Sequence, residues 1–173
     1  MRATRSSGRT PDLDVYDIAF LAGGAERVVD AALVALVESG HVRVYAPGEL
    51  VVVEPSRTHP VEAAVMDAVG AEGHRSIDTI RSRLADDARI GALGRSLCSA
   101  GLLRRRLRFG HRASDDRDWS LTASGREALD RRAERPSVRA LDRGSTLQVA
   151  LYGWAAMPDA DPSLAAHRTD GGG

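Results

Sequence analysis

The sequence predicts a mainly α-helical fold with short β-hairpins, an α+β class in which one order of elements occurs twice. Three observations predict this class. Apolar residues recur at three- and four-residue spacings through much of the chain, which is the pattern of helices that bury one face. Glycines stand at the ends of these apolar segments, where helices commonly stop. Each group of helices is followed by two short strand-like stretches that a polar turn joins.

The first elements are two helices separated by a pair of glycines. Residues 1–11 are a polar arm that we expect to be disordered. Asp12 or Asp14 can cap a short helix, VYDIAFLA, which ends at Gly23-Gly24. The second helix is predicted from about Ala25 to Ser39. It is apolar around most of its circumference, so we expect it to be mostly buried.

A hairpin follows Gly40, whose position suits the end of a helix. HVRVY alternates between apolar and polar residues, APGE is a turn signal, and LVVVE is the returning strand. The order of helix, helix, glycine, strand, turn and strand is that of a winged helix. In that fold a hairpin called the wing packs beside a small helical bundle.

The same order returns after the linker PSRTHP. Helices are predicted over HPVEAAVMDAV, over IDTIRSRLAD with Ser76 as its cap, and from about Ala88 to Ala100. Gly101 then takes the place that Gly40 has in the first group. LLRRRLRF and WSLT are strand-like stretches around the polar loop GHRASDDRD, and Ser124 caps a final helix.

These elements predict two tandem winged-helix-like units, at residues 12–55 and 58–135, with the first one abbreviated. Neither unit is large enough to form a stable hydrophobic core alone, so we expect the two units to share a core interface. Residues 136–166 predict a C-terminal helical extension in which Trp154 docks onto the module, because a solvated Trp is unusual. Residues 167–173 are expected to be a flexible tail.

Three segments, LDVYDIAFLAGGAERVVDAALVALVESGHVRV, HPVEAAVMDAV and VALYGWAAMPDADPSLAAH, resemble an uncharacterised family of high-GC bacteria. The resemblance covers about residues 12–166, and LAGG and the HP start of the second unit are its most specific marks. Family members are usually labelled only as membrane proteins, because many add transmembrane segments around this region. The family has no established activity, cofactor or catalytic residue, so the resemblance implies none here.

This chain departs from that pattern, because none of its apolar runs approaches the length that spans a bilayer. It looks like a soluble version of the family. Its N-terminus has three arginines but no apolar region after them, so it does not resemble a secretory signal. The single Cys98 cannot form an intrachain disulfide. We therefore expect a cytoplasmic protein.

Little in the sequence predicts catalysis. Gly23-Gly24 does not match a phosphate-binding loop, and we expect a tight corner in which one glycine takes a positive φ and the other permits close approach. Asp86-Asp87 resembles a helix cap and Asp115-Asp116 a loop tip. No histidine pairs with another, or with Cys98, at a metal-ligand spacing; the five are His41, His59, His74, His111 and His167. We assign no catalytic, metal or cofactor-binding residue.

A basic surface is the sharper candidate for function. All 24 basic residues are arginines and they balance 24 acidic ones, which argues against a dominant polyanion-binding role. Residues 11–59 have three arginines and eight acids, whereas residues 60–135 have fifteen arginines and twelve acids. A winged helix reads DNA with its third helix and its wing. The arginines at these places are Arg89, Arg95, Arg104, Arg105, Arg106, Arg108 and Arg112.

Three functional hypotheses follow, of which an enzyme is the least supported, because the sequence has no nucleophile–base set, metal cluster or cofactor loop. The third helix displays Ser96 and Ser99 but no Asn, Gln or Lys for base edges. The basic wing can equally dock on the acidic first unit or on a partner protein. The leading hypothesis is a non-catalytic regulatory or protein-interaction module with a protein partner. The alternative is a DNA-binding regulator that uses the third helix and the basic wing of the second unit.

Overall fold

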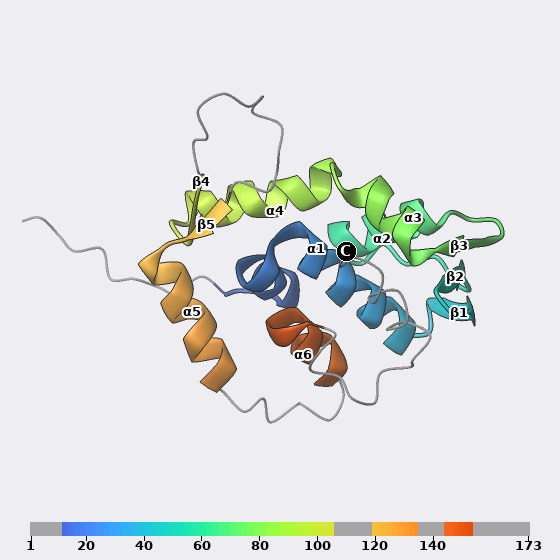
Figure 1. Ribbon diagram of the computed structural model, residues 1–173, viewed down its shortest axis with the longest axis horizontal. Helices are drawn as coiled ribbons and strands as arrows, with labels where there is room; N and C mark the ends of the chain where they lie inside the picture. Colours follow the sequence, from blue (N-terminus) through green and yellow to red (C-terminus); the bar gives the residue numbers. More distant parts are fainter. Residues whose placement is uncertain (1–11, 106–118, 135–143, 154–173) are drawn as a thin grey trace, which may run out of the picture.

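The computed structural model describes residues 12–105, 119–134 and 144–153. Within these ranges the chain has six helices and two small antiparallel sheets (Figure 1), which confirms the predicted α+β class. The helices are α1 (Val15–Glu38), α2 (Pro60–Val69), α3 (Ile77–Leu84), α4 (Ala88–Ser99), α5 (Ala123–Glu134) and α6 (Gly144–Tyr152). The strands are β1 (Val42–Ala46), β2 (Glu49–Val52), β3 (His74–Ser76), β4 (Leu103–Arg105) and β5 (Trp119–Leu121).

The helix α1 contains the predicted break at the paired glycines. Asp14 caps it, because its side chain accepts hydrogen bonds from the backbone N–H groups of Tyr16 and Asp17. Gly24 has φ 70° and ψ −159°, a conformation that is essentially restricted to glycine. A Cβ added at Gly23 would lie 2.9 Å from the Cβ of Arg27. One glycine thus supplies the positive φ and the other the close approach, as the sequence predicts.

The hairpin of β1 and β2 forms as predicted, but the strand β3 is not predicted by the sequence. It adds to β2 in antiparallel register, so that the first sheet has the order β1-β2-β3. The backbone N–H of Ile77 also donates to the carbonyl of Gly48 at 2.9 Å. The sheet therefore joins the two units that the sequence predicts. A three-residue strand, His-Arg-Ser, is too short to show an alternating pattern.

Polar side chains set the starts of the later helices. His59 caps α2 through its Nδ1, Ser76 caps α3 and Asp87 caps α4. The prediction that Ser124 caps α5 is wrong. The hydroxyl of Thr122 accepts from the backbone N–H of Gly125 at 3.0 Å, which places the cap two residues earlier. The loop GHRASDDRD lies outside the described residues.

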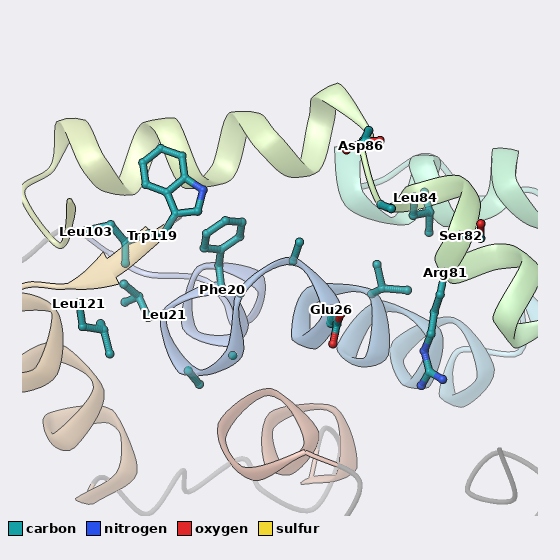
Figure 2. Close-up of a pocket in the computed structure, with 16 residues that line it drawn as sticks. Phe20, Leu21, Glu26, Arg81, Ser82, Leu84, Asp86, Leu103, Trp119 and Leu121 are labelled. Carbon is teal, nitrogen blue, oxygen red and sulfur yellow. The ribbon is translucent and has the colours of Figure 1, made fainter. Parts of the chain in front are cut away.

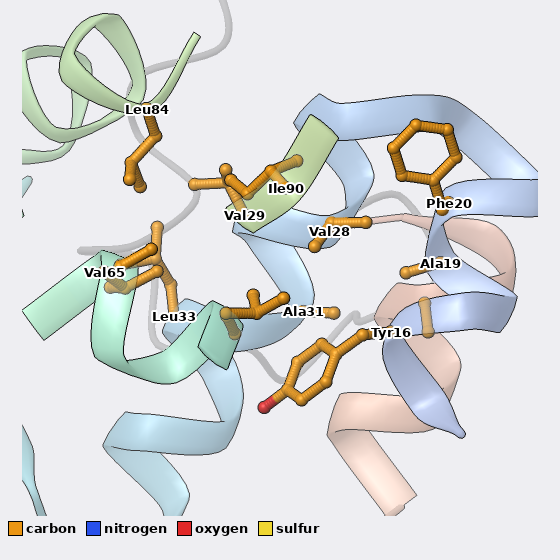
Figure 3. Packing of buried hydrophobic residues seen from close by; sticks show 14 of the residues in the cluster. Tyr16, Ala19, Phe20, Val28, Val29, Ala31, Leu33, Val65, Leu84 and Ile90 are labelled. Atoms are coloured by element: carbon orange, nitrogen blue, oxygen red, sulfur yellow. The ribbon is translucent and has the colours of Figure 1, made fainter. Parts of the chain in front are cut away.

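One hydrophobic cluster draws on all six helices. Figure 3 shows the part of it in which Val65 of α2, Leu84 of α3 and Ile90 of α4 pack around α1. The second half of α1 is buried as predicted, with Val28, Ala31 and Leu33 fully inaccessible to solvent. Because the cluster includes residues from 12–55 and from 58–135, the two predicted units share a core. Their exact division stays a prediction.

Part of the predicted C-terminal extension packs on α1 as α6. Val149 and Ala150 join the hydrophobic cluster, and the hydroxyl of Thr146 donates to the carboxylate of Glu38 at 2.6 Å. Trp154 lies outside the described residues. In the described part of the chain, no helix combines the length and apolar character that crossing a membrane requires.

We predict that Leu36→Asp and Leu97→Asp each abolish cooperative unfolding. The two leucines are 1% and 2% exposed, and each substitution places a carboxylate in the core without a partner. The expected loss exceeds about 4 kcal/mol of the free energy of unfolding. Urea denaturation followed by circular dichroism measures this free energy. The control is Ser96→Asp, because Ser96 is exposed and lies next to Leu97 on α4. A cooperative transition retained by either core variant would contradict this packing.

We also predict that Gly24→Ala lowers the free energy of unfolding by about 1 to 3 kcal/mol, because alanine is strained at this φ and ψ. A Cβ at Gly24 would touch nothing within 4 Å, so the loss would come from the backbone alone. Chemical denaturation gives the value, and the exposed Glu26→Ala in the next turn should change it little. Equal stability of Gly24→Ala and wild type would remove the strain argument.

Candidate functional site

A pocket of about 580 Å³ opens beside the Gly23–Gly24 kink, and we call it the kink pocket. Its walls come from α1 on both sides of the kink, from the end of α3 with the turn that follows, and from the sheet of β4 and β5 (Figure 2). The large apolar residues that line it are Phe20, Leu21, Val29, Leu84, Leu103, Trp119 and Leu121. Because α1 bends at the glycines, two walls of the pocket come from one helix.

Two aromatic rings form the apolar end of the kink pocket. Phe20 and Trp119 meet edge to face, with ring centroids 6.4 Å apart and planes at 75°. Gly94 on α4 lies directly behind them. A Cβ at Gly94 would be 2.7 Å from Cζ of Phe20 and 3.0 Å from Cε2 of Trp119. The absence of a side chain at Gly94 therefore lets both rings rest against α4.

The other end of the kink pocket is mixed, because Arg81 and Asp86 lie there with Leu84, and Glu26 lies between the two ends. The guanidinium of Arg81 binds the carboxylate of Asp30 at 2.7 Å, and this ion pair links α3 to α1. Glu26 and Asp86 are exposed, and within the described ranges neither carboxylate has a hydrogen bond or an ion pair. The turn leaves Asp86 at the rim because Asp87, the next residue, is used to cap α4.

Arg89, the first of the predicted DNA-contacting arginines, is partly exposed, and two carboxylates hold its guanidinium. Its guanidinium binds Asp67 at 2.7 Å and Asp87 at 2.8 Å, which connects α2 to the start of α4. The Arg89 guanidinium holds the pKa of both carboxyls below the ordinary range, and the two carboxylates raise the pKa of Arg89. A phosphate group would have to displace two carboxylates to reach this side chain.

The other described arginines of the predicted basic surface are exposed. Arg95 donates to the carbonyl of Ala88 at 3.3 Å, and Arg104 donates to the hydroxyl of Ser120 at 3.0 Å. The guanidinium of Arg105 lies 5.4 Å from the centre of the Trp119 ring. Neither Arg104 nor Arg105 pairs with a carboxylate among the residues that the structure describes. Arg106, Arg108 and Arg112 lie outside the described residues.

Two of the described histidines, His59 and His74, make contacts that support the fold, whereas the buried Nδ1 atom of His41 has no hydrogen-bond partner among the described residues. The Nδ1 atom of His59 accepts from the backbone of α2, while its Nε2 lies 3.3 Å from the carboxylate of Asp14. His74 binds Glu49 at 2.6 Å and stacks on Tyr45, with ring centroids 4.5 Å apart. Over the described ranges, His, Cys, Asp and Glu side chains form no group of three or more suited to hold a metal ion.

The sequence does not predict the kink pocket, because its walls come from segments far apart in the chain. One signal points toward it. Gly94 stands in the middle of a predicted helix, where glycine costs about 1 kcal/mol relative to alanine and often marks a close approach. Phe20 and Trp119 are also two of the few aromatic residues in a chain with only 4% aromatics.

Comparison of the chain with protein-family models, with curated proteins and with solved structures finds no match. The resemblance to a family of high-GC bacteria stays a prediction. The function proposed below is therefore argued from the geometry of this chain.

We predict that the stabilising effect of Arg89 depends on pH. The lowered pKa of Asp67 and Asp87 means that their ion pairs stabilise the fold above the unfolded value of 3.8, and that this contribution is lost as the pH falls through the lower folded values. The difference in the free energy of unfolding between wild type and Arg89→Ala should be largest at neutral pH and shrink below about pH 4.

Urea titrations across this pH range measure the difference between the two proteins. Arg95→Ala is the matched control, because Arg95 lies on the same helix and its guanidinium contacts a carbonyl instead of a carboxylate. Its difference from wild type should not change with pH. A constant difference for Arg89→Ala would show that the ion pairs with Asp67 and Asp87 do not stabilise the fold.

Proposed function

We propose that the chain is a non-catalytic protein-interaction module that takes a segment of a partner protein into the kink pocket. The observation that carries the proposal is the apolar wall of this pocket, where Phe20, Trp119 and Leu121 surround an open volume of about 580 Å³. Protein interiors are otherwise close-packed, and open apolar surface on this scale is typical of binding sites. Aromatic side chains are also enriched at the energetic centres of interfaces.

The shape of the kink pocket favours an extended ligand. Figure 2 shows Trp119, Leu103 and Leu121 toward one end, Leu84, Ser82 and Arg81 toward the other, and Phe20 and Glu26 between them. A stretch of polypeptide can place several side chains along such a row. The apolar end would take an aromatic or aliphatic anchor residue of the ligand. The other end would contact the ligand residues next to this anchor.

The order of elements supports the finer interpretation of the fold. The order α2, β3, α3, α4, β4 and β5 is that of a winged helix, with β4 and β5 as the two strands of the wing. On this interpretation the kinked α1 with the hairpin of β1 and β2 is the abbreviated first unit. The pairing of β3 with β2 ties the two units together, so that the kink pocket belongs to one scaffold.

DNA binding through α4 and the wing is the second candidate. It is favoured by Arg104 and Arg105, which are exposed on β4 and have no carboxylate partner within the described ranges. It is weakened by Arg89, whose guanidinium is occupied by Asp67 and Asp87. Apart from Arg95, the exposed positions of α4 are alanines and serines, which offer few groups for reading base edges.

Selection from a displayed peptide library tests the interaction module. We expect peptides that bind wild type and lose at least about tenfold in affinity on Leu121→Glu, which places a charge on the apolar wall of the kink pocket. Val53→Glu is the matched control, because Val53 is an exposed apolar residue that does not line the pocket. Circular dichroism checks that both variants fold. No enriched peptide, or peptides that bind Leu121→Glu equally well, would contradict the proposal.

Fluorescence anisotropy with a labelled random DNA duplex tests the second candidate. We expect no binding at about 20 mM salt, where contacts to phosphates are strongest. Salt-sensitive binding that disappears when Arg104 and Arg105 are both replaced by alanine would favour the DNA-binding regulator instead.

A further inference from the structure

We infer that the segment bound in the kink pocket carries a basic side chain, Arg or Lys, next to an apolar anchor. This inference rests on the proposed function and specifies the chemistry of the partner. It is carried by two carboxylates, Glu26 and Asp86, that stand at the rim of an apolar pocket without a partner among the described residues.

The two carboxylates come from different elements. Glu26 lies on α1 just after the kink, and Asp86 lies in the turn between α3 and α4 (Figure 2). The fold, and not a single acidic stretch, brings both to one pocket. Neither carboxylate is used for a helix cap, since Asp14 caps α1 and Asp87 caps α4.

The one basic residue among the described residues that line the kink pocket is already neutralised. Arg81 lines the kink pocket, but its guanidinium lies 2.7 Å from Asp30 and 3.9 Å from Asp78. The Asp30 side chain is only 14% exposed, so this ion pair is shielded from water. The charges of Glu26 and Asp86 are therefore not balanced by Arg81, and the rim is acidic. A basic group of a ligand would gain an attraction that is stronger beside an apolar wall than in open water.

A positive charge at the opposite end of the kink pocket sets the direction of the ligand. The guanidinium of Arg105 lies 5.4 Å from the centre of the Trp119 ring, so this end of the pocket already has a positive charge beside it. A basic ligand residue is therefore repelled from the Trp119 end and attracted toward Glu26 and Asp86. The apolar anchor goes to Phe20, Leu103 and Leu121. The same acidic rim disfavours an acidic peptide or a nucleic acid in this pocket.

A charge-reversal selection tests the inference. The peptide library is panned on wild type and on the double variant Glu26→Lys/Asp86→Lys. Peptides from wild type should be enriched in Arg and Lys beside an aromatic or aliphatic residue, and peptides from the double variant should be enriched in Asp and Glu. The control Glu54→Lys/Glu72→Lys makes the same change in net charge at two exposed acids outside the pocket, and it should select the same peptides as wild type.

Affinity of one selected basic peptide gives a second readout. Trp154→Phe leaves Trp119, in the wall of the kink pocket, as the only tryptophan of the two in the chain, so its fluorescence reports occupancy. In this background, Glu26→Gln/Asp86→Asn should weaken the Kd at least about tenfold and reduce its dependence on salt. The matched control Glu54→Gln/Glu72→Gln should leave the Kd unchanged.

The outcomes separate this inference from the function on which it rests. Peptides that require an intact Leu121 but show no preference for Arg or Lys, or no switch on charge reversal, would overturn the basic partner and leave the interaction module in place. Failure to select any peptide that depends on Leu121 would overturn both.

Discussion

The packing of every other helix against α1 is the constraint on which the rest of the structure depends. Its second half is almost entirely apolar, and small residues such as Ala31 and Ala32 let neighbouring helices approach closely. Polar contacts then fix the neighbours in place. The Tyr16 hydroxyl donates to Glu62 of α2, and Arg27 donates to the carbonyl of Val149 in α6. The bend at Gly23–Gly24 lies in the lining of the kink pocket, so the helix that organises the core also contributes to the candidate site.

The features that depend on local sequence could be predicted. The α+β class, the break at Gly23–Gly24 and the buried second helix follow from glycine placement and apolar spacing, which act over a few residues. The strand β3 could not be predicted, because its pairing depends on β2 lying beside it. The residue that caps α5 also could not be predicted from local sequence. Thr122 and Ser124 both carry a hydroxyl, and only the direction of the incoming chain decides which one meets the backbone.

The candidate site was less accessible to sequence reasoning, because it depends on contacts between distant segments. The sequence places Arg89 on the third helix of the second unit, where a DNA-binding protein would use it, but does not reveal that Asp67 lies opposite. Likewise, nothing local to Glu26 or Asp86 indicates that the two carboxylates line one pocket. The distribution of charges along the sequence therefore indicates the arginines as the functional residues. The ion pairs in the structure indicate the acidic rim of the kink pocket instead.

The shared sheet has a consequence for how this chain can be divided. The strand β3 has only three residues, and its ladder is completed by β2 from the other side of the linker. A fragment that begins at α2 would lack the β2 strand with which β3 pairs. A fragment that ends at the hairpin would expose the edge of β2, and an exposed strand edge promotes aggregation. Because the two halves also share one hydrophobic core, we expect neither to fold alone, so that both must be expressed as one polypeptide.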